Sequence, residues 1–357
     1  MAVNKNKKTG KWYFSVRYTD FEGKTKQKKM EGFITKKEAK KACENFEKKH
    51  SDQPSVLFKT FAIRYLNDMK TKTKLSTQES AENVVRIHLI PFFGEMPLVN
   101  INEETVQQWQ TQMENKTKPN GEPYSQVSLR KIHSRLSSIF NYAMKKCNLK
   151  SNPAKTAGSI GKREKDEFSF WSLDEYKLFR NEVAEDPKLY YAFEVLYWTG
   201  IREGELLALN KEDFDLKEKT LKICKTLYHA NGKDTITTTK TKKGNRIIPI
   251  PESLCEEMKE YFNLQYNLKP NERAFLLSKT KLYNGMAKYS NKAGVKKIRI
   301  HDLRHSHISL LINKGVDAVT IGARVGHASQ HITLHYAHLF AATEKQVAKT
   351  LNSLMED

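Results

Sequence analysis

Hydrophobic positions recur at helical spacing along most of the chain and alternate with polar positions only in short stretches. In residues 57–150 the apolar side chains fall at intervals of three and four, which is typical of amphipathic helices. We predict one helix that stops before Pro91, one over Thr105–Met113 and a long one over Ser128–Lys146. The pattern therefore predicts a helical domain over residues 57–153, bounded by the polar segments 51–55 and 154–167.

The first fifty residues have a different pattern. Aromatic and branched residues over 12–18, a turn over 20–23 and an alternating stretch over 24–30 predict two strands, and residues 32–34 could start a third. Thr35, with Glu38 three positions later, forms a capping box that predicts a helix. We therefore predict a small domain of three strands and one helix over residues 1–50.

Residues 168–357 combine both patterns. Helical segments come first, and strand-like runs follow over Leu221–Ile223 and Arg246–Ile250, with the polar stretch 235–245 between them as a hairpin candidate. The remainder is helical. The predicted fold class is a multidomain protein, mainly α with small β elements, that ends in a mixed α/β domain.

The charge balance changes the functional picture. The chain has 62 Lys and Arg against 41 Asp and Glu, a net charge of +21, which predicts attraction to a polyanion. Nucleic acid is the first candidate, followed by an anionic membrane surface and by acidic proteins. No apolar run approaches the roughly 18 residues that span a bilayer. The four cysteines form no CxxC pair, which favours free thiols in a reducing cytosol.

Two basic segments are candidates for DNA contact. Residues 1–50 hold 15 Lys and Arg against 6 Asp and Glu, and a sheet face carrying Arg17, Lys26 and Lys28 could enter a DNA groove. The candidate DNA-binding residues are Trp12, Tyr13, Arg17, Lys26 and Lys28 in this domain and Arg130, Lys131 and Arg135 on the long helix. The alternative for any one of them is a solvated surface position.

Six residues of the last domain suggest phosphate chemistry. Arg202 follows a Thr-Gly helix break, and an arginine fork suits two phosphate oxygens. His301, Arg304 and His305 share one helical face, and His327 follows a glycine. The phenol of Tyr336, with a pKa of ~10, needs such a field to become a nucleophile. Taken singly, these residues are also explained by surface ion pairs, a capping histidine or a core tyrosine.

A metal site is the main chemical alternative. His301 and His305, and likewise His331 and His335, have the i, i+4 spacing that can ligate zinc. No HExxH motif or suitably spaced carboxylate accompanies them, and neighbouring arginines would repel a cation. We therefore expect neither a metal nor a cofactor.

The ordered motifs resemble those of the tyrosine recombinase family. They are TGIREGELLALNKEDFD, the hairpin TKTKKGNRIIPIP, and HDLRHSHISLLINKGVDAVTIGARVGHASQHITLHYAH. The resemblance implies that Tyr336 attacks a DNA phosphodiester, while Arg202 and Arg304 clamp the phosphate and His327 hydrogen-bonds it. It implies that His301 accepts the tyrosine proton and that a hairpin lysine protonates the leaving 5′-oxygen. Lys240 is our first choice among Lys240, Lys242 and Lys243, and Lys242 is the second.

The N-terminal part resembles the arm-binding and core-binding domains of integrases from temperate phages and conjugative transposons. This implies an arm-type DNA-binding domain (1–50), a core-binding domain (57–153) and a catalytic domain (168–357). The expected partner is double-stranded DNA at core and arm attachment sites, bound by a homotetramer. An excisionase and a host DNA-bending protein are candidate accessory partners. The expected location is the cytoplasm of a bacterial host, at the nucleoid when active.

Three alternatives share part of this pattern. A chromosome-dimer resolvase has the same chemistry, but the basic residues 1–50 argue against it. A type IB topoisomerase also forms a phosphotyrosine, yet the motif spacing and chain length favour a recombinase. A non-catalytic DNA-binding protein would not need the full set of residues. The apolar helical pattern after Tyr336 fits packing on a neighbouring subunit or on its own domain.

Overall fold

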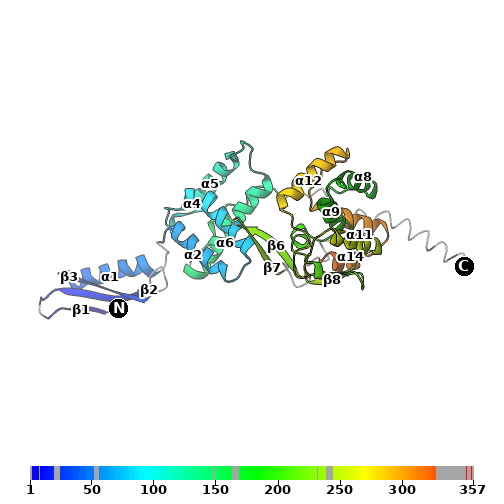
Figure 1. Ribbon diagram of the computed structural model, residues 1–357. Helices are drawn as coiled ribbons and strands as arrows, with labels where there is room; N and C mark the ends of the chain where they lie inside the picture. Colours follow the sequence, from blue (N-terminus) through cyan, green and yellow to red (C-terminus); the bar gives the residue numbers. More distant parts are fainter. Residues whose placement is uncertain are drawn as a thin grey trace. The chain divides into compact units, whose positions relative to one another are not determined.

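The computed structural model describes residues 2–326 except 8, 20–24, 52–55, 148, 163–168, 231 and 239–243, together with residues 351 and 355. The chain divides into two compact units, Met1–Lys165 and Asp166–Asp357. Figure 1 shows that helices dominate and that the sheets are small, which confirms the predicted fold class. Among the described residues, no helix combines the length and apolar character needed to span a bilayer.

The first unit begins with a three-stranded antiparallel sheet. Its strands, in spatial order, are β1 (Ala2–Lys5), β2 (Trp12–Thr19) and β3 (Thr25–Phe33). Helix α1 (Lys36–Ser51) packs on one face, where Phe14 is fully buried next to the rings of Phe33 and Phe46. The capping box is confirmed, since Glu38 N–H donates to Thr35 Oγ1 at 3.2 Å and Thr35 N–H donates to Glu38 Oε2 at 3.3 Å.

The strands of this sheet differ from the prediction in two places. Residues 2–5 form β1, which the sequence pattern did not indicate. Residues 32–34 do not start a separate strand, because β3 continues through a bulge to Phe33. Trp12 pairs with Phe33 and Tyr13 with Glu31, which leaves Gly32 between them at φ 105°. A glycine that suggests a break in the sequence therefore acts as a bulge within one strand.

The register of β2 and β3 determines which side chains share a face. Phe14 is opposite Met30 and Val16 is opposite Lys28. Because side chains alternate with a period of two, Lys26 and Lys28 lie on the face that α1 packs against.

The other face, here called the open face, carries Arg17. Its side chains on β2 and β3 are Tyr13, Ser15, Arg17, Gln27, Lys29 and Glu31. The expectation that Arg17, Lys26 and Lys28 share a face is therefore wrong. Opposite partners in an antiparallel pair point to the same side, and the partner of Arg17 is Gln27 rather than either lysine.

The first unit continues with a helical bundle, as its hydrophobic spacing predicts. Its helices are α2 (Phe58–Lys70), α3 (Leu75–Val84), α4 (Ile90–Phe93), α5 (Glu103–Asn115), α6 (Gln126–Cys147) and α7 (Pro153–Thr156), with a π-helical turn at Val85–Leu89 and a 3₁₀ turn at Leu98–Asn100. Large apolar side chains from several helices, including Phe58, Phe93, Trp109 and Phe140, form its core.

Pro91 does not stop a helix, contrary to the prediction. The π-helical turn shifts the backbone hydrogen bonds, so that Ile90 N–H donates to Val85 O, five residues back. Pro91 then lies in the first turn of α4, where its missing N–H costs no intrahelical bond. The helical path therefore continues to Phe93.

The second unit combines helices with two small sheets. Its helices are α8 (Leu173–Val183), α9 (Pro187–Thr199), α10 (Glu203–Leu206), α11 (Glu252–Asn263), α12 (Lys279–Lys292), α13 (Asp302–Asn313) and α14 (Ala318–Val325), with a 3₁₀ turn at Lys211–Asp213. Its strands are β4 (Phe214–Asp215), β5 (Thr220–Ile223), β6 (Lys225–Ala230), β7 (Lys233–Thr238) and β8 (Arg246–Pro249). The apolar helix α9 runs through the core.

The hairpin that the described residues form in this unit starts earlier than the predicted stretch 235–245, of which residues 239–243 lie outside the described residues. Strands β6 and β7 pair from Lys225 opposite Thr238 to Ala230 opposite Lys233. The sequence signal for β6 was weak because the strand is largely polar and Leu227 is its buried apolar side chain. The other sheet pairs β5 with both β4 and β8.

Candidate active site

The first candidate arginine follows a turn at which only glycine fits. Gly200 ends α9 in the left-handed conformation (φ 65°), and its N–H donates to Leu196 O at 3.0 Å. A Cβ atom at this position would lie 2.6 Å from Cδ2 of His307. Both the backbone conformation and the close approach to α13 therefore require glycine, and the turn places Arg202 directly before α10.

Arg202 is oriented by Glu205 one helical turn later. The Arg202 backbone N–H donates to Oε2 of Glu205 at 3.0 Å, and Nη1 donates to Oε1 at 2.9 Å. Nη2 donates to the carbonyl oxygen of Gly326 at 3.3 Å. The Arg202 side chain is nevertheless 36% exposed. Its guanidinium is therefore held in place and still reaches solvent.

Glu205 has a second arginine partner that the sequence pattern did not single out. Arg246, the first residue of β8, donates from Nη2 to Oε2 of Glu205 at 3.0 Å and from Nη1 to Oε1 at 3.4 Å. Burial alone would raise the pKa of the Glu205 carboxyl, but the charges of Arg246 and Arg202 outweigh this effect and lower it. Glu205 is therefore a buried anion between two guanidiniums.

Arg304 is nearly fully buried on α13, with 3% of its surface exposed. Its Nη1 donates to the carbonyl oxygen of Gly200 at 2.7 Å. Since a buried charge is stable only when polar groups surround it, this bond fixes where the guanidinium lies. The same turn thus presents Arg202 and holds Arg304.

His301 lies directly before α13 and reaches solvent. Partial desolvation lowers the pKa of His301, and the charges of Arg304 and Arg202 lower it further. The ring is therefore neutral at pH 7. Because both arginines act on this one imidazole, the structure brings together Arg202, His301 and Arg304, which the sequence proposes as partners.

His305 is buried next to the exposed His301, with the two rings edge to face and their centroids 5.1 Å apart. Burial, followed by the influence of His301, lowers the pKa of His305 to about 4. The buried Asp302 accepts hydrogen bonds from the backbone N–H and the guanidinium of Arg299 at 2.7 to 3.1 Å. Its Oδ1 is 3.8 Å from His305 Nε2, too far for a hydrogen bond.

The remaining predicted catalytic residues lie outside the described residues. These are Lys240 and its alternative Lys242, His327 and Tyr336; the segment that follows Tyr336 is also outside them, except residues 351 and 355. Their described neighbours are Thr238, which ends β7, and Gly326, which ends α14 at φ 71°. The roles assigned to these residues stay predictions.

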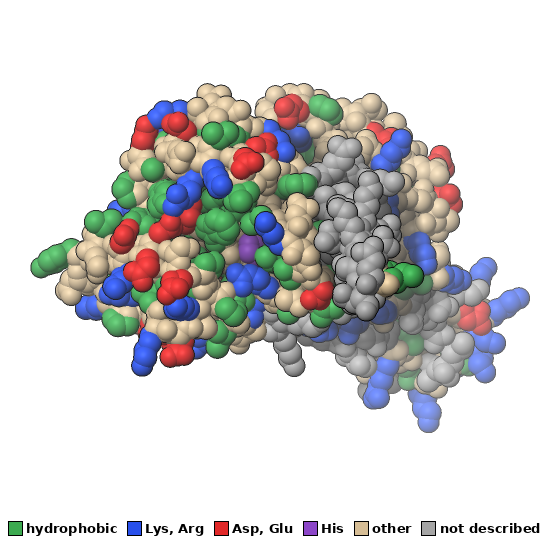
Figure 2. Space-filling model, turned by 90° about the vertical axis from the view of Figure 1, so that its right-hand side faces the viewer, with side chains coloured by type: hydrophobic (Ala, Val, Ile, Leu, Met, Phe, Trp, Pro, Cys, Tyr) green, Lys and Arg blue, Asp and Glu red, His purple; other side chains and the backbone are tan. Residues whose placement is uncertain are grey.

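The candidate DNA-binding residues differ in exposure. Arg17, Lys26, Lys28 and Lys131 are exposed, whereas Trp12, Tyr13, Arg130 and Arg135 are half-buried. Arg135 donates from Nη1 to Tyr65 Oη at 3.0 Å, so part of its donor capacity is used inside the bundle. Figure 2 shows one face of the molecule, where a histidine side chain lies at the surface next to basic and hydrophobic side chains.

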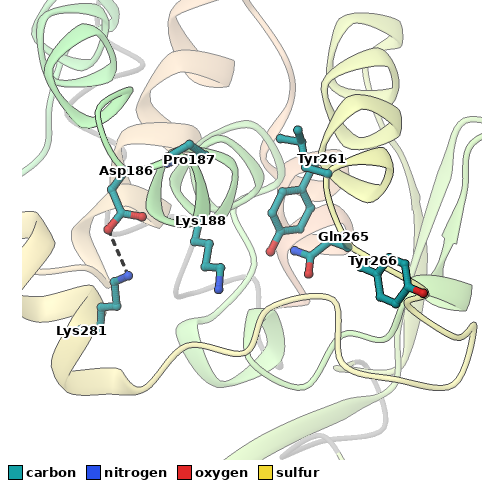
Figure 3. Close-up of a pocket in the computed structure, with 8 residues that line it drawn as sticks. Asp186, Pro187, Lys188, Tyr261, Gln265, Tyr266 and Lys281 are labelled. Carbon is teal, nitrogen blue, oxygen red and sulfur yellow. Dashed lines mark ion pairs between the residues drawn. The ribbon is translucent and has the colours of Figure 1, made fainter.

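A hollow of about 500 Å³ lies among the start of α9, the end of α11 and the start of α12. Figure 3 shows side chains that line it, with Asp186 and Lys281 paired at 3.0 Å and Tyr266 at the edge. None of the predicted catalytic residues lines this hollow, and its polar groups do not converge on one point. Within the described part of the chain, no three His, Cys, Asp or Glu side chains are grouped to hold a metal ion.

Comparisons with known proteins place this geometry in context. Residues 173–343 match the model of the phage integrase family, residues 2–50 match an arm DNA-binding domain, and residues 57–113 match the N-terminal SAM-like domain of phage integrases. The ICEBs1 integrase of Bacillus subtilis is 28% identical over 334 residues, which cover 89% of each chain.

Solved structures share the fold. The Tn1549 transposon integrase in complex with a circular intermediate DNA is similar with a TM-score of 0.67 and 18% identity, over 81% of this chain and 98% of that chain. A lambda integrase tetramer bound to a Holliday junction is similar with a TM-score of 0.57 and 18% identity, over 92% of this chain and 96% of that chain. At this level of identity the likeness concerns the fold.

Proposed function

Since the chain belongs to the phage integrase family of tyrosine recombinases, we propose that it cuts and rejoins DNA at specific sites to integrate and excise a mobile element. One observation supports this proposal above the others. Two guanidiniums, one held by Glu205 and one by the carbonyl of Gly200, both act on the neutral imidazole of His301. This is a site suited to an anion beside a proton acceptor.

In the proposed reaction, Oη of Tyr336 attacks the scissile phosphorus and the bond from phosphorus to the 5′-oxygen breaks. The tyrosine proton passes to His301, and Lys240 gives a proton to the leaving 5′-oxygen. The products are a 3′-phosphotyrosyl link and a free 5′-hydroxyl. Attack by a 5′-hydroxyl of the partner strand reverses these steps, so the bond energy is conserved and no ATP is needed.

The described residues supply two parts of this reaction. Arg202 and Arg304 stabilise the negative charge that grows on the phosphate oxygens, and their fixed positions avoid reorganisation during the step. His301 is neutral at pH 7 because its pKa is lowered, so it is able to accept a proton. His327 completes the hydrogen bonds to the phosphate in the proposal.

DNA binding is divided among the domains in this proposal. Residues 1–50 bind arm sites through the open face, where Tyr13, Arg17 and Lys29 lie together. Residues 57–153 bind the core site with Arg130 and Lys131 on α6, and the catalytic domain 168–357 binds the core DNA from its own side. A tetramer assembles on two DNA segments at the host nucleoid, with an excisionase and a DNA-bending protein as accessory partners.

The decisive experiment follows covalent attachment to a suicide attachment-site substrate that traps the cleaved intermediate. We expect the wild-type protein to become linked to DNA and Tyr336→Phe to bind the same DNA without forming the link. Tyr228→Phe, which changes a tyrosine on β6, is the matched control and should still cleave. The proposal fails if Tyr336→Phe cleaves the substrate or if the wild type never becomes attached.

The choice of Lys240 is tested with a substrate whose leaving oxygen is replaced by sulfur. A thiolate leaves without a proton, so this substrate should restore cleavage by Lys240→Ala. Rescue of Lys242→Ala with no rescue of Lys240→Ala would transfer the role to Lys242.

A further inference from the structure

Arg324 connects four elements of the catalytic unit although it has no place in the proposed reaction. It lies on α14 and is half-buried. Its Nε donates to Nε2 of His307 on α13 at 3.1 Å, Nη1 donates to Pro249 O on β8 at 2.8 Å, and Nη2 donates to Trp198 O on α9 at 3.2 Å. One side chain thus fixes α14 to α13, β8 and the end of α9.

His307 is suited to its part in this arrangement. The side chain is buried, with 2% of its surface exposed. Burial, and then the charge of Arg324, lower the pKa of His307 to about 3, so the ring is neutral and Nε2 can accept the arginine bond. The His307 ring also lies against Gly200, where a Cβ atom would come within 2.6 Å of it.

Arg324 and His307 are connected through neighbouring residues to both candidate phosphate-binding arginines, Arg202 and Arg304. The His307 ring lies beside Gly200, whose carbonyl oxygen accepts the hydrogen bond of Arg304. The carbonyl of Arg324 accepts from Nε of Arg246 at 2.7 Å, and Arg246 also binds Glu205, the partner of Arg202. A short chain of direct contacts therefore leads from Arg324 to each guanidinium.

We propose that Arg324 and His307 are positioning residues that hold the guanidiniums of Arg202 and Arg304 at the spacing required by one scissile phosphate. The inference rests on the proposed function and deepens it, since it names side chains that act on the phosphate through others. It assigns Arg324 no contact with DNA, since each of its three side-chain nitrogens donates to a protein acceptor.

Loss of this pair should slow cleavage and leave DNA binding unchanged. A displacement of about 1 Å at a reacting centre costs on the order of 100-fold in rate. We therefore expect Arg324→Leu to lower the single-turnover cleavage rate about 100-fold, with the affinity for core-site DNA within about twofold of wild type. A direct contact with DNA would instead weaken binding.

A substrate of altered charge separates positioning from general damage. In a methylphosphonate substrate, a methyl group replaces one non-bridging oxygen and removes the charge that the arginines neutralise. Cleavage of this substrate depends less on arginine position, so we expect Arg324→Leu to lose less than about 10-fold on it. Arg180→Leu is the control, because Arg180 binds Glu194, Tyr190 and Glu257 on α9 and α11. Arg180→Leu should lower the cleavage rate by the same factor on the normal and the methylphosphonate substrate.

His307 provides a second and milder test. His307→Phe keeps a ring but removes the acceptor for Arg324, whereas His307→Gln keeps an acceptor. We expect His307→Phe to follow Arg324→Leu and His307→Gln to recover at least about 10-fold of the lost rate. These two variants decide the matter if Arg324→Leu does not fold.

Equal losses on both substrates, or full activity of His307→Phe, would overturn the positioning role in a protein that otherwise cleaves DNA. A wild-type protein that forms no covalent link with either substrate would overturn the proposed function, and this inference with it. The two failures are distinguishable because the first requires an active wild type.

Discussion

The N-terminal sheet and the catalytic unit use basic side chains in opposite ways. On the open face of the sheet, Arg17 and Lys29 are exposed on strands whose register sets only the direction in which they project. In the catalytic unit, Arg304 is buried and bound to the carbonyl of Gly200, and Arg202 is held by a buried carboxylate. The first arrangement leaves charge exposed to solvent, and the second holds it between buried protein groups.

The difference indicates what each region can do. Exposed charges attract a polyanion at long range and release counterions, which gives affinity that depends on salt. Fixed charges in a partly dry site stabilise a transition state because they need no reorganisation during the reaction. The sheet should therefore tolerate exchange among basic residues, and the catalytic unit should not.

Exchange of arginine for lysine should give the largest difference between the two regions. Arg304→Lys keeps the charge but loses the planar fork, so one ammonium cannot hold both Gly200 O and a phosphate. We expect the single-turnover cleavage rate to fall about 1000-fold. Arg17→Lys on the open face is the matched control, and its arm-site affinity should change less than about threefold. Comparable small effects of both exchanges would show that the arginine in the catalytic unit is not fixed for chemistry.

The turn that holds Arg304 gives the next largest effect. Gly200→Ala brings a Cβ against His307 and strains a positive φ, so it should destabilise the catalytic unit by about 2 kcal/mol and slow cleavage about 100-fold. Gly294→Ala is the control, because Gly294 has nearly the same φ, 64° against 65°, with open space around it. Denaturant unfolding and cleavage assays on the two variants separate backbone strain from the contact with His307. Equal cleavage by both would remove the turn from the site.

The sequence could predict the site residues that are recognisable from their residue type and their spacing within a motif. The motifs identify Arg202, His301 and Arg304 as partners. Arg246, Arg324 and His307 were not assigned to the site. Two of the three hydrogen bonds of Arg324 go to backbone carbonyls and all three join segments that are distant in sequence, so they leave no residue pattern.

The sheet shows the same limit at the level of the backbone. β2, most of β3 and the capping box follow from local residue types, whereas β1 does not, and the third strand expected at 32–34 is the end of β3. The pairing register depends on a bulge at Gly32, and the assignment of Arg17 and Lys28 to opposite faces depends on that register. Local patterns therefore predict which segments form strands and helices better than they predict which face of the sheet a side chain occupies.

Lowering the pH should destabilise α13 in the catalytic unit and leave the N-terminal sheet unchanged. His305 and His307 have pKa values lowered to about 4 and about 3, whereas both titrate near 6.5 in the unfolded chain. Between the folded and unfolded pKa values of each histidine, the unfolded state binds more protons than the folded state. The contribution of these two histidines to the free energy of unfolding is therefore fully present above pH ~7 and decreases as the pH drops below ~6.5. Each histidine should contribute up to about 1.4 kcal/mol per pH unit.

Hydrogen exchange of the full-length protein between pH 7 and 5 measures this effect once intrinsic exchange rates are corrected. Protection of α13 should decrease, and protection of β2 and β3 should not, because residues 2–46 contain no histidine. His307→Gln should reduce the pH dependence of α13 by the share of one histidine. An α13 whose stability is unchanged down to pH 5 would contradict the neutral, buried state of both rings.

The smallest expected effect tests the open face itself with two adjacent lysines. Lys28 and Lys29 lie on opposite faces of β3, and Lys29 is placed over the ring of Tyr13 at 4.7 Å and paired with Glu31. If the open face contacts arm-site DNA, Lys29→Gln should weaken binding about fivefold and reduce the salt dependence by about one counterion, while Lys28→Gln changes affinity less than about twofold. Binding titrations with arm-site DNA at several salt concentrations measure both quantities. The reverse order would mean that DNA approaches from the side of α1, and the exposed charge on the open face would then have to serve something other than arm-site affinity.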